Sequence, residues 1–211
     1  MPSTHRSPRS FTEPPLNNPS TSLLGAIYHG IPFAFSNREG VTKPRVYNFF
    51  RHLRHDNPST KIGAAGYCWG GKYTTYLCAG WNNSSLDPYP SNNVDVLDAS
   101  KDKEEYLIDA GYTAHPSQLT IPRDVQTLSK PLSIANGTRD FQLTPAKMKE
   151  VKRVFEERKG DGPECELVVY EEAKHGFAVR WNPKDEREQR QGEESEDQAV
   201  RWFAKHFAAA Q

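Results

Sequence analysis

The sequence predicts an α/β fold in which helices flank a mostly parallel sheet. Two observations indicate this fold. Short apolar runs that suit buried strands alternate along the chain with longer segments of helical periodicity, and parallel strands need such crossover connections. The length of 211 residues suits one domain of this kind, and the chain contains no internal repeat.

The N-terminal segment is not expected to belong to this fold. Residues 1–22 are rich in proline and hydroxyl side chains and lack the apolar core of a secretory signal, so the sequence predicts a disordered tail there and a single domain over residues 23–211. Residues 23–35 are apolar but interrupted by Gly30 and Pro32. We expect a short helix and then a loop in this segment; a strand ending at His29 is the alternative.

Four strands and four helices are expected after residue 40. The strands are short apolar runs followed by turn residues: Lys61–Gly66, Tyr106–His115, Pro131–Ala135 and Glu164–Tyr170. The helices are Val41–His55, Lys72–Ala79, Pro145–Lys159 and Glu193–Phe207. Of two polar stretches, Asn82–Glu105 is expected to be an exposed excursion, and the run DEREQRQGEESED at residues 185–197 a solvated face or loop.

Composition and charge exclude several classes of function. Lys plus Arg and Asp plus Glu both number 27, so the chain has no net charge and nucleic acid is not an expected partner. No segment approaches the roughly 20 apolar residues that cross a bilayer, so no membrane partner is expected. Three cysteines without close pairs argue against a disulfide framework and indicate a reducing, cytoplasmic location.

The run GYCWGG places Cys68 between a predicted strand and a predicted helix, which is the pattern of a nucleophile elbow. Such a sharp turn presses its neighbours together, so side chains at Gly66 and Gly70 are expected to clash. A helix that begins at Trp69 directs its N-terminus at the sulfur and favours the thiolate, and the Trp69 N–H is an expected oxyanion-hole donor. The alternative is a buried core cysteine in a glycine turn.

A cysteine nucleophile needs a base, and the base needs a carboxylate that orients it. Asp140 follows the strand predicted at residues 131–135, and His175 follows the strand predicted at residues 164–170. Both are therefore expected at the carboxyl ends of strands, where ligands bind in open α/β sheets. The chain order nucleophile, acid, histidine is the order found with nucleophile elbows. The sequence therefore predicts a Cys68–His175–Asp140 triad.

The remaining candidates for chemistry are expected to be structural. Cys78, on the helix after the elbow, is expected to be a core thiol, and Cys165, at the start of a strand, is expected to be structural. His115 is expected to cap a strand or to bond to the backbone rather than to move protons. Asp109, the rival carboxylate, is expected inside a strand rather than at its carboxyl end.

With these residues in place, the chain resembles the dienelactone hydrolase family, the Cys-dependent branch of the α/β hydrolases. The matching pieces are GAAGYCWGGKY, AHPS, NGTRDFQLTP and AKHGFAVR, within residues 61–180. The resemblance implies an α/β-hydrolase fold, a small-molecule ester or lactone substrate, an acyl-enzyme intermediate, and no metal or organic cofactor. It also implies Cys68 as nucleophile, His175 as base and Asp140 as acid, with Arg180 near the place of an arginine that binds the substrate carboxylate.

The chain departs from the family pattern at its front. An α/β hydrolase forms several strands before the nucleophile strand, and a loop after an early strand supplies the second oxyanion-hole donor, but only 60 residues precede Lys61. We therefore expect the early strands to be missing; the alternative places a strand and an oxyanion loop at Ala26–Gly30. An uncovered sheet edge predicts self-association. The second hypothesis for function is a catalytically weak or inactive relative that acts as an interaction protein.

Overall fold

The computed structural model describes residues 36–80 and 106–208. The chain divides into two compact units, residues 1–42 and 43–211, and the sheet and the site discussed below belong to the second. The predicted tail, the segment 23–35 and the stretch Asn82–Glu105 lie outside the described residues, so those expectations, and the domain start at residue 23, stay predictions. None of the described helices is both long enough and apolar enough to cross a membrane.

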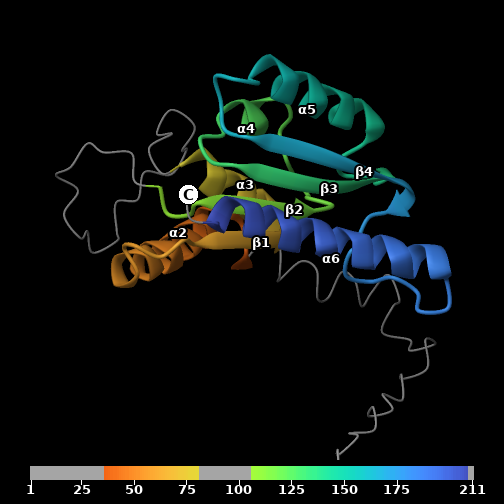
Figure 1. Ribbon diagram of the computed structural model, residues 1–211, viewed down its shortest axis with the longest axis horizontal. Coiled ribbons are helices and arrows are strands. Elements are labelled where there is room, and N and C mark those ends of the chain that lie inside the picture. Colours follow the sequence, from red (N-terminus) through yellow and green to blue (C-terminus); the bar gives the residue numbers. More distant parts are fainter. Residues whose placement is uncertain (1–35, 81–105, 209–211) are drawn as a thin grey trace, which may run out of the picture. The chain divides into compact units, whose positions relative to one another are not determined.

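The predicted parallel sheet is confirmed (Figure 1). Its four strands lie in the order β1-β2-β3-β4, and every neighbouring pair is parallel. The strands are β1 (Gly63–Tyr67), β2 (Ala110–Ala114), β3 (Leu132–Arg139) and β4 (Cys165–Lys174). Because all four strands run the same way, their carboxyl ends meet at one edge of the sheet, and the loops that follow the strands can build a common site there.

Five helices connect and cover these strands in the described ranges. They are α2 (Glu39–Asp56), α3 (Trp69–Ala79), α4 (Arg123–Gln126), α5 (Pro145–Glu157) and α6 (Glu186–Phe207). Four of them correspond to predicted helices. The single turn of α4 was not predicted, because four residues are too few to display a helical period.

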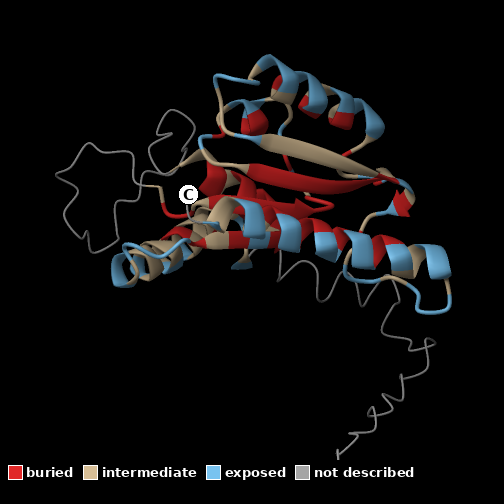
Figure 2. Cartoon of the chain, in the orientation of Figure 1, coloured by how far each residue is buried: buried red, intermediate tan, exposed pale blue. Residues whose placement is uncertain are grey.

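Two apolar clusters, one on each face of the sheet, form the core. On one face, Leu77 of α3 and Val151 of α5 pack with Ile134 of β3. On the other face, Tyr112 of β2 packs with Trp202 of α6. Figure 2 shows the resulting pattern, in which the central strands β2 and β3 are largely buried, the outer strands β1 and β4 are partly exposed, and the helices bury the side that faces the sheet. Burial on both faces explains why the central strands are short apolar runs rather than alternating ones.

Helix α6 begins at Glu186, seven residues before the predicted start at Glu193. The Asp185 side chain accepts hydrogen bonds from the backbone N–H groups of Arg187 and Glu188, which satisfies donors that a helix start leaves unpaired. The charged run at residues 185–197 is therefore the cap and first turns of a helix. Its inner face carries polar side chains such as Gln191, so hydrophobic periodicity did not mark it.

The strands β3 and β4 both run four residues further than predicted. The sequence NGTR, expected to end β3 after Ala135, continues the strand to Arg139. Gly137 allows this, because a Cβ there would lie 2.0 Å from the Ala173 carbonyl oxygen of β4. The two extended strands end at Arg139 and Lys174, so each delivers a predicted triad residue immediately after its last position.

Candidate active site

Cys68 occupies the turn between β1 and α3 in a conformation that side chains rarely adopt, with φ 50° and ψ −119°. Its backbone is held from both sides: its N–H donates to the Ala114 carbonyl, and its own carbonyl accepts from the N–H groups of Gly71 and Ser117. A positive φ at a non-glycine residue costs free energy and persists only when the surroundings enforce it. The predicted sharp turn at the cysteine is therefore present.

The glycines of this turn are needed for close packing, but not all at the expected positions. A Cβ on Gly66 would lie 2.3 Å from Thr74 Oγ1 and 2.6 Å from the Gly70 carbonyl oxygen, as predicted. A Cβ on Gly70 would meet nothing within 4 Å, so the clash expected there was wrong. The crowded position is Gly71, whose Cβ would lie 2.2 Å from Thr113 Oγ1.

Asp140, which is buried, and His175, which is partly buried, form a pair with Asp140 Oδ2 and His175 Nδ1 separated by 2.8 Å. Asp140 directly follows β3, and its other oxygen accepts from the backbone N–H groups of Gln142 at 2.6 Å and Leu143 at 3.1 Å. His175 directly follows β4, and Phe141 packs its ring against the imidazole. Backbone donors thus fix the carboxylate, and the carboxylate fixes the imidazole with its Nε2 available for chemistry.

His115 makes the contact with the sulfur that sequence reasoning missed. It directly follows β2, is fully buried, and holds its Nδ1 3.2 Å from Cys68 Sγ. Its φ of 42° turns the chain sharply at this point. Burial, followed by the proximity of His175, lowers the pKa of His115 to about 4, so its imidazole is neutral at physiological pH. The expected roles of His115, a strand cap or a bond to the backbone in preference to proton chemistry, did not include this contact with the sulfur.

The two imidazoles lie side by side around the thiol. Their ring centroids are 5.0 Å apart, and Cys68 Sγ, a nitrogen of His115 and a nitrogen of His175 all lie within 4.8 Å of one another. His175 Nε2 also lies 3.4 Å from the Ser117 hydroxyl. The structure therefore brings the three predicted triad residues together. The sulfur is in hydrogen-bond contact with His115, and a nitrogen of His175 lies within 4.8 Å of it.

The electrostatics of the thiol differ from the expectation of a stabilised thiolate. Burial raises the pKa of Cys68, and the Arg180 guanidinium opposes that rise through its charge and a hydrogen bond to the sulfur. The nearby Asp140 carboxylate raises the pKa further, whereas the Trp69 backbone N–H lowers it. Trp69 and Arg180 thus both lower the pKa of the Cys68 thiol, but burial outweighs them, and the resting group is a thiol.

The residues expected to be structural are placed away from this edge or deep in the core. Cys78 is fully buried, and burial raises its pKa well above the usual value. Burial likewise raises the pKa of Cys165 to about 11. Asp109 precedes β2 rather than lying inside it, and it accepts hydrogen bonds from Arg54 and the Ile62 N–H at the amino ends of the strands. It is therefore remote from the carboxyl-end site.

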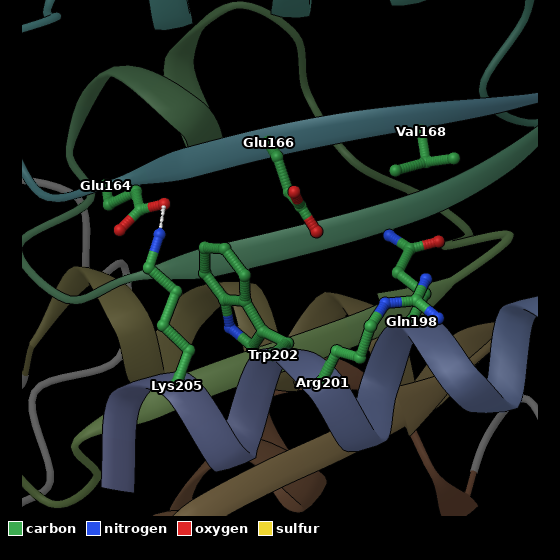
Figure 3. A pocket seen from close by; sticks show the side chains of 7 residues that line it. All are labelled: Glu164, Glu166, Val168, Gln198, Arg201, Trp202 and Lys205. Atoms are coloured by element: carbon green, nitrogen blue, oxygen red, sulfur yellow. Dashed lines mark hydrogen bonds and ion pairs between the residues drawn. The ribbon is translucent and has the colours of Figure 1, made fainter. Parts of the chain in front are cut away.

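A polar pocket of about 160 Å³ lies elsewhere, between β4 and α6 (Figure 3). An ion pair between Glu164 and Lys205 spans it, and Trp202 lines its wall. Glu164 directly precedes β4, so this pocket belongs to the opposite end of that strand from His175. It is not part of the Cys68 site.

Comparison with known proteins identifies the family. The model of the dienelactone hydrolase family matches residues 34–207, most of the chain. The chain belongs to this family. Among curated proteins it is similar to the hydrolase pyvD of Aspergillus violaceofuscus, 28% identical over 167 residues, which cover 79% of this chain and 56% of that protein. It is also 27% identical over 198 residues to the hydrolase tropI of Talaromyces stipitatus, covering 92% and 65% of the two chains.

Solved structures agree on the fold. The chain matches a dienelactone hydrolase-like promiscuous phosphotriesterase, P91, from metagenomic libraries with a TM-score of 0.54 and 16% identity, covering 85% of this chain and 66% of that one. It matches the acylaminoacyl peptidase of Pyrococcus horikoshii with a TM-score of 0.53 and 12% identity, covering 82% and 29%. The α/β-hydrolase fold implied by the sequence is thereby confirmed. This dienelactone hydrolase family member spans between about half and two thirds of the curated relatives it matches.

Proposed function

We propose that this member of the hydrolase family cleaves a carboxylic ester or lactone bond, with Cys68 as nucleophile, His175 as general base and Asp140 as the group that orients the base. The observation that carries the proposal is the Asp140–His175 pair, 2.8 Å apart, beside a cysteine held in a strained turn. A nucleophile after β1, an orienting carboxylate after β3 and a base after β4, all at the same edge of the sheet, are the parts that acyl transfer requires.

Of the two imidazoles, His175 suits the role of base better than His115. A general base works best when its pKa lies near the operating pH, and the pKa of His115 is lowered to about 4. The described structure places a carboxylate on His175 Nδ1, whereas His115 Nε2 is buried and has no hydrogen-bond partner among the described residues. An imidazolium formed at His175 is therefore stabilised by a direct hydrogen bond to Asp140, whereas at His115 burial outweighs the more distant attraction of that carboxylate.

The proposed reaction runs through an acyl-enzyme. The Cys68 side chain rotates from His115 toward His175, whose Nε2 takes the thiol proton as the sulfur bonds to the substrate carbonyl carbon. The carbonyl electrons move to oxygen and return as the C–O bond breaks, and His175 gives its proton to the departing alkoxide. Water then loses a proton to His175 and attacks the thioester, and the sulfur leaves and regains that proton.

Two further groups have proposed roles in substrate binding. The proposed oxyanion-hole donor is the Trp69 backbone N–H, which lowers the pKa of the adjacent Cys68 thiol. Arg180 is exposed, and its charge also lowers that pKa. Its guanidinium can bind a substrate carboxylate, because carboxylates accept bidentate hydrogen bonds from arginine.

A test of the proposal is capture of the acyl-enzyme. We expect purified protein mixed with p-nitrophenyl acetate to release nitrophenolate in a burst, and peptide mass mapping to find the acetyl group on Cys68. Asp140→Asn and His175→Asn should abolish the burst while a Cys165→Ala control retains it. A folded wild-type protein that carries no acetyl group on Cys68, with this ester or with dihydrocoumarin as lactone, would contradict the proposal.

One observation favours the second hypothesis, a family member that has lost most of its activity and acts as an interaction protein. The resting thiol bonds to the neutral His115 and has a raised pKa, which is an arrangement that restrains a nucleophile. The acylation experiment separates the two functions. An inert Cys68 in a folded protein that elutes only as an assembly with another chain would support the second.

A further inference from the structure

We propose that Cys68, His115 and His175 form a binding site for a thiophilic divalent cation such as Zn²⁺, and that the bound ion holds the protein inactive. Cys68 Sγ lies 3.2 Å from His115 Nδ1, and one donor atom from each of the three residues lies within 4.8 Å of the other two. A thiolate and two imidazoles are the ligand types that Zn²⁺ prefers.

The spacing suits a metal after a small contraction. Zinc binds sulfur at about 2.3 Å and nitrogen at about 2.0–2.1 Å, which puts neighbouring tetrahedral ligands roughly 3.5 Å apart. The pair Cys68–His115 already has such a separation. The third ligand, His175, has to close by about 1.3 Å at most, a distance within the range of side-chain rotation at Cys68 and His175, which are both half-buried.

The surroundings of His175 support the site independently. Asp140 Oδ2 accepts from His175 Nδ1, which leaves Nε2 as the nitrogen that turns toward the sulfur. A carboxylate behind a histidine ligand is the usual second partner of protein zinc sites, because it fixes the ring orientation and makes the ligand nitrogen more basic. Asp140 is itself fixed by two backbone N–H groups, so this support is rigid.

Arg180 opposes the ion. Its positive charge acts on the sulfur strongly enough to lower the pKa of the Cys68 thiol, so it also repels a cation bound there. The side chain is exposed and can leave the site for solvent. On binding, the thiol loses its proton to solvent, the sulfur and the two imidazole nitrogens each donate one electron pair to the ion, and a fourth position remains for water.

The inhibitory part of this inference rests on the proposed function, whereas the binding part does not. The ion occupies the sulfur and the His175 nitrogen that the proposed reaction needs free. A chain stripped of metal should therefore form the acyl-enzyme, and one equivalent of Zn²⁺ should stop it.

The experiment uses Co²⁺ as a coloured substitute for Zn²⁺ on chelator-treated, full-length protein. We expect one Co²⁺ per chain, a thiolate-to-cobalt charge-transfer band in the near ultraviolet and tetrahedral bands in the visible, all removed by Zn²⁺. Cys68→Ser should abolish the charge-transfer band, and Asp140→Asn should weaken binding about 10–100-fold. Arg180→Gln should tighten it. The matched controls Cys165→Ala and His52→Asn should bind like wild type.

The part played by His115 needs its own readouts, because the residue is fully buried and its variants risk misfolding. His115→Asn should weaken Co²⁺ binding at least tenfold. X-ray absorption of the wild-type Zn²⁺ complex should count one sulfur and two imidazoles, and a single imidazole would overturn the site. An unchanged charge-transfer band in Cys68→Ser would also overturn the site. Acylation of Cys68 without any metal binding defeats this inference alone, and metal binding without acylation defeats the proposed function alone.

Discussion

At the scale of single residues, the state of the Cys68 thiol is decided by opposing influences on its pKa. Burial raises that pKa, the Arg180 guanidinium lowers it, and burial is the larger effect. Thiols react with alkylating agents through their thiolate, so reactivity at a given pH reports the pKa directly. Arg180 is exposed, and its removal should therefore test the electrostatics of the site without disturbing the core.

We expect Arg180→Gln to slow the alkylation of Cys68 by limiting iodoacetamide and to shift its pH profile to higher pH. The reason is that the variant loses the positive charge and the hydrogen bond that favour the thiolate. Mass mapping across a pH series measures the rate for each cysteine separately. Arg187→Gln, a change at an exposed arginine on α6, is the control. A faster reaction in Arg180→Gln would contradict the assignment.

His115 should make the protein sensitive to acid. Its pKa is about 4 when folded and 6.5 in an unperturbed chain, so between these values the unfolded state binds more protons and stability falls as pH falls. The loss from this group approaches the order of 3 kcal/mol as pH falls from 6.5 to about 4. Urea unfolding at several pH values should show a shallower decline in His115→Gln than in wild type. His52→Gln, at an exposed site, should follow the wild-type profile.

At this scale the sequence indicated which residues follow strand ends, but it did not indicate the contact that His115 makes with the sulfur. The order and the strand-end positions of Asp140 and His175 were visible in the sequence, and the structure brings both beside Cys68. The contact between His115 and the sulfur depends on the pairing of β1 with β2 and on the positive φ of His115. Neither feature has a local sequence signal, so a role beyond the backbone could not be predicted.

At the scale of elements, the turn from β1 into α3 places the nucleophile, and adjacent glycines in it differ in what they tolerate. A Cβ on Gly71 would overlap Thr113 Oγ1 and lie 2.9 Å from Pro116 Cβ, whereas one on Gly70 would meet nothing within 4 Å. The motif GYCWGG showed that small residues are needed here. It could not show which of them, because the crowding atoms belong to β2 and the segment after it.

Gly71→Ala should destabilise the protein by about 1–3 kcal/mol, since overpacking forces neighbouring backbone to move. Gly70→Ala should be neutral or stabilise by up to about 1 kcal/mol, because alanine is the better helix former and the space is open. Thermal unfolding of both variants measures the difference. Equal stability of the two would mean that the turn does not pack against β2 as described.

The elements whose ends were mispredicted are those whose limits are set by tertiary contacts. β3 continues past its glycine because Gly137 lies against the Ala173 backbone of β4. α6 begins early because the Asp185 cap and the packing of Gly192 against Trp181 stabilise a stretch without apolar periodicity. In both cases the position of each element was predictable, and only the neighbouring element fixed where it stops or starts.

At the scale of the whole second unit, α6 packs across the sheet and contacts both outer strands, β1 and β4 (Figure 1). A Cβ on Gly63 of β1 would lie 2.6 Å from the Phe203 ring, so the end of α6 rests directly on that strand. At the other side of the sheet, Gln191 donates to the Glu171 carbonyl of β4. Because α6 bridges the strand that begins the elbow and the strand that ends at His175, disturbing it should affect the site and the fold together. The predicted self-association through the sheet edge stays untested.

Gln198 is the residue of α6 at which a single substitution should weaken the packing of this helix on the sheet most. Its buried amide donates to Ser133 Oγ of β3 at 2.8 Å and accepts from the Tyr170 hydroxyl of β4 at 2.9 Å. Gln198→Leu keeps the volume but leaves the buried Tyr170 hydroxyl without this acceptor, at a cost of about 1–3 kcal/mol. We expect Tm to fall by roughly 5 °C, since each kcal/mol shifts Tm by about 2–4 °C at this size.

The matched control for that change is Gln189→Leu on the outer side of the same helix, where the amide bonds to Glu193. Its Tm should stay near that of wild type. Unfolding followed by far-ultraviolet dichroism and by release of Cys68 to alkylation should give coincident transitions in every variant, because α6 holds the strands that carry the site. If Cys68 in Gln198→Leu became open to alkylation well below the Tm of that variant, the elbow would open locally. The site would then not unfold together with α6, contrary to this prediction.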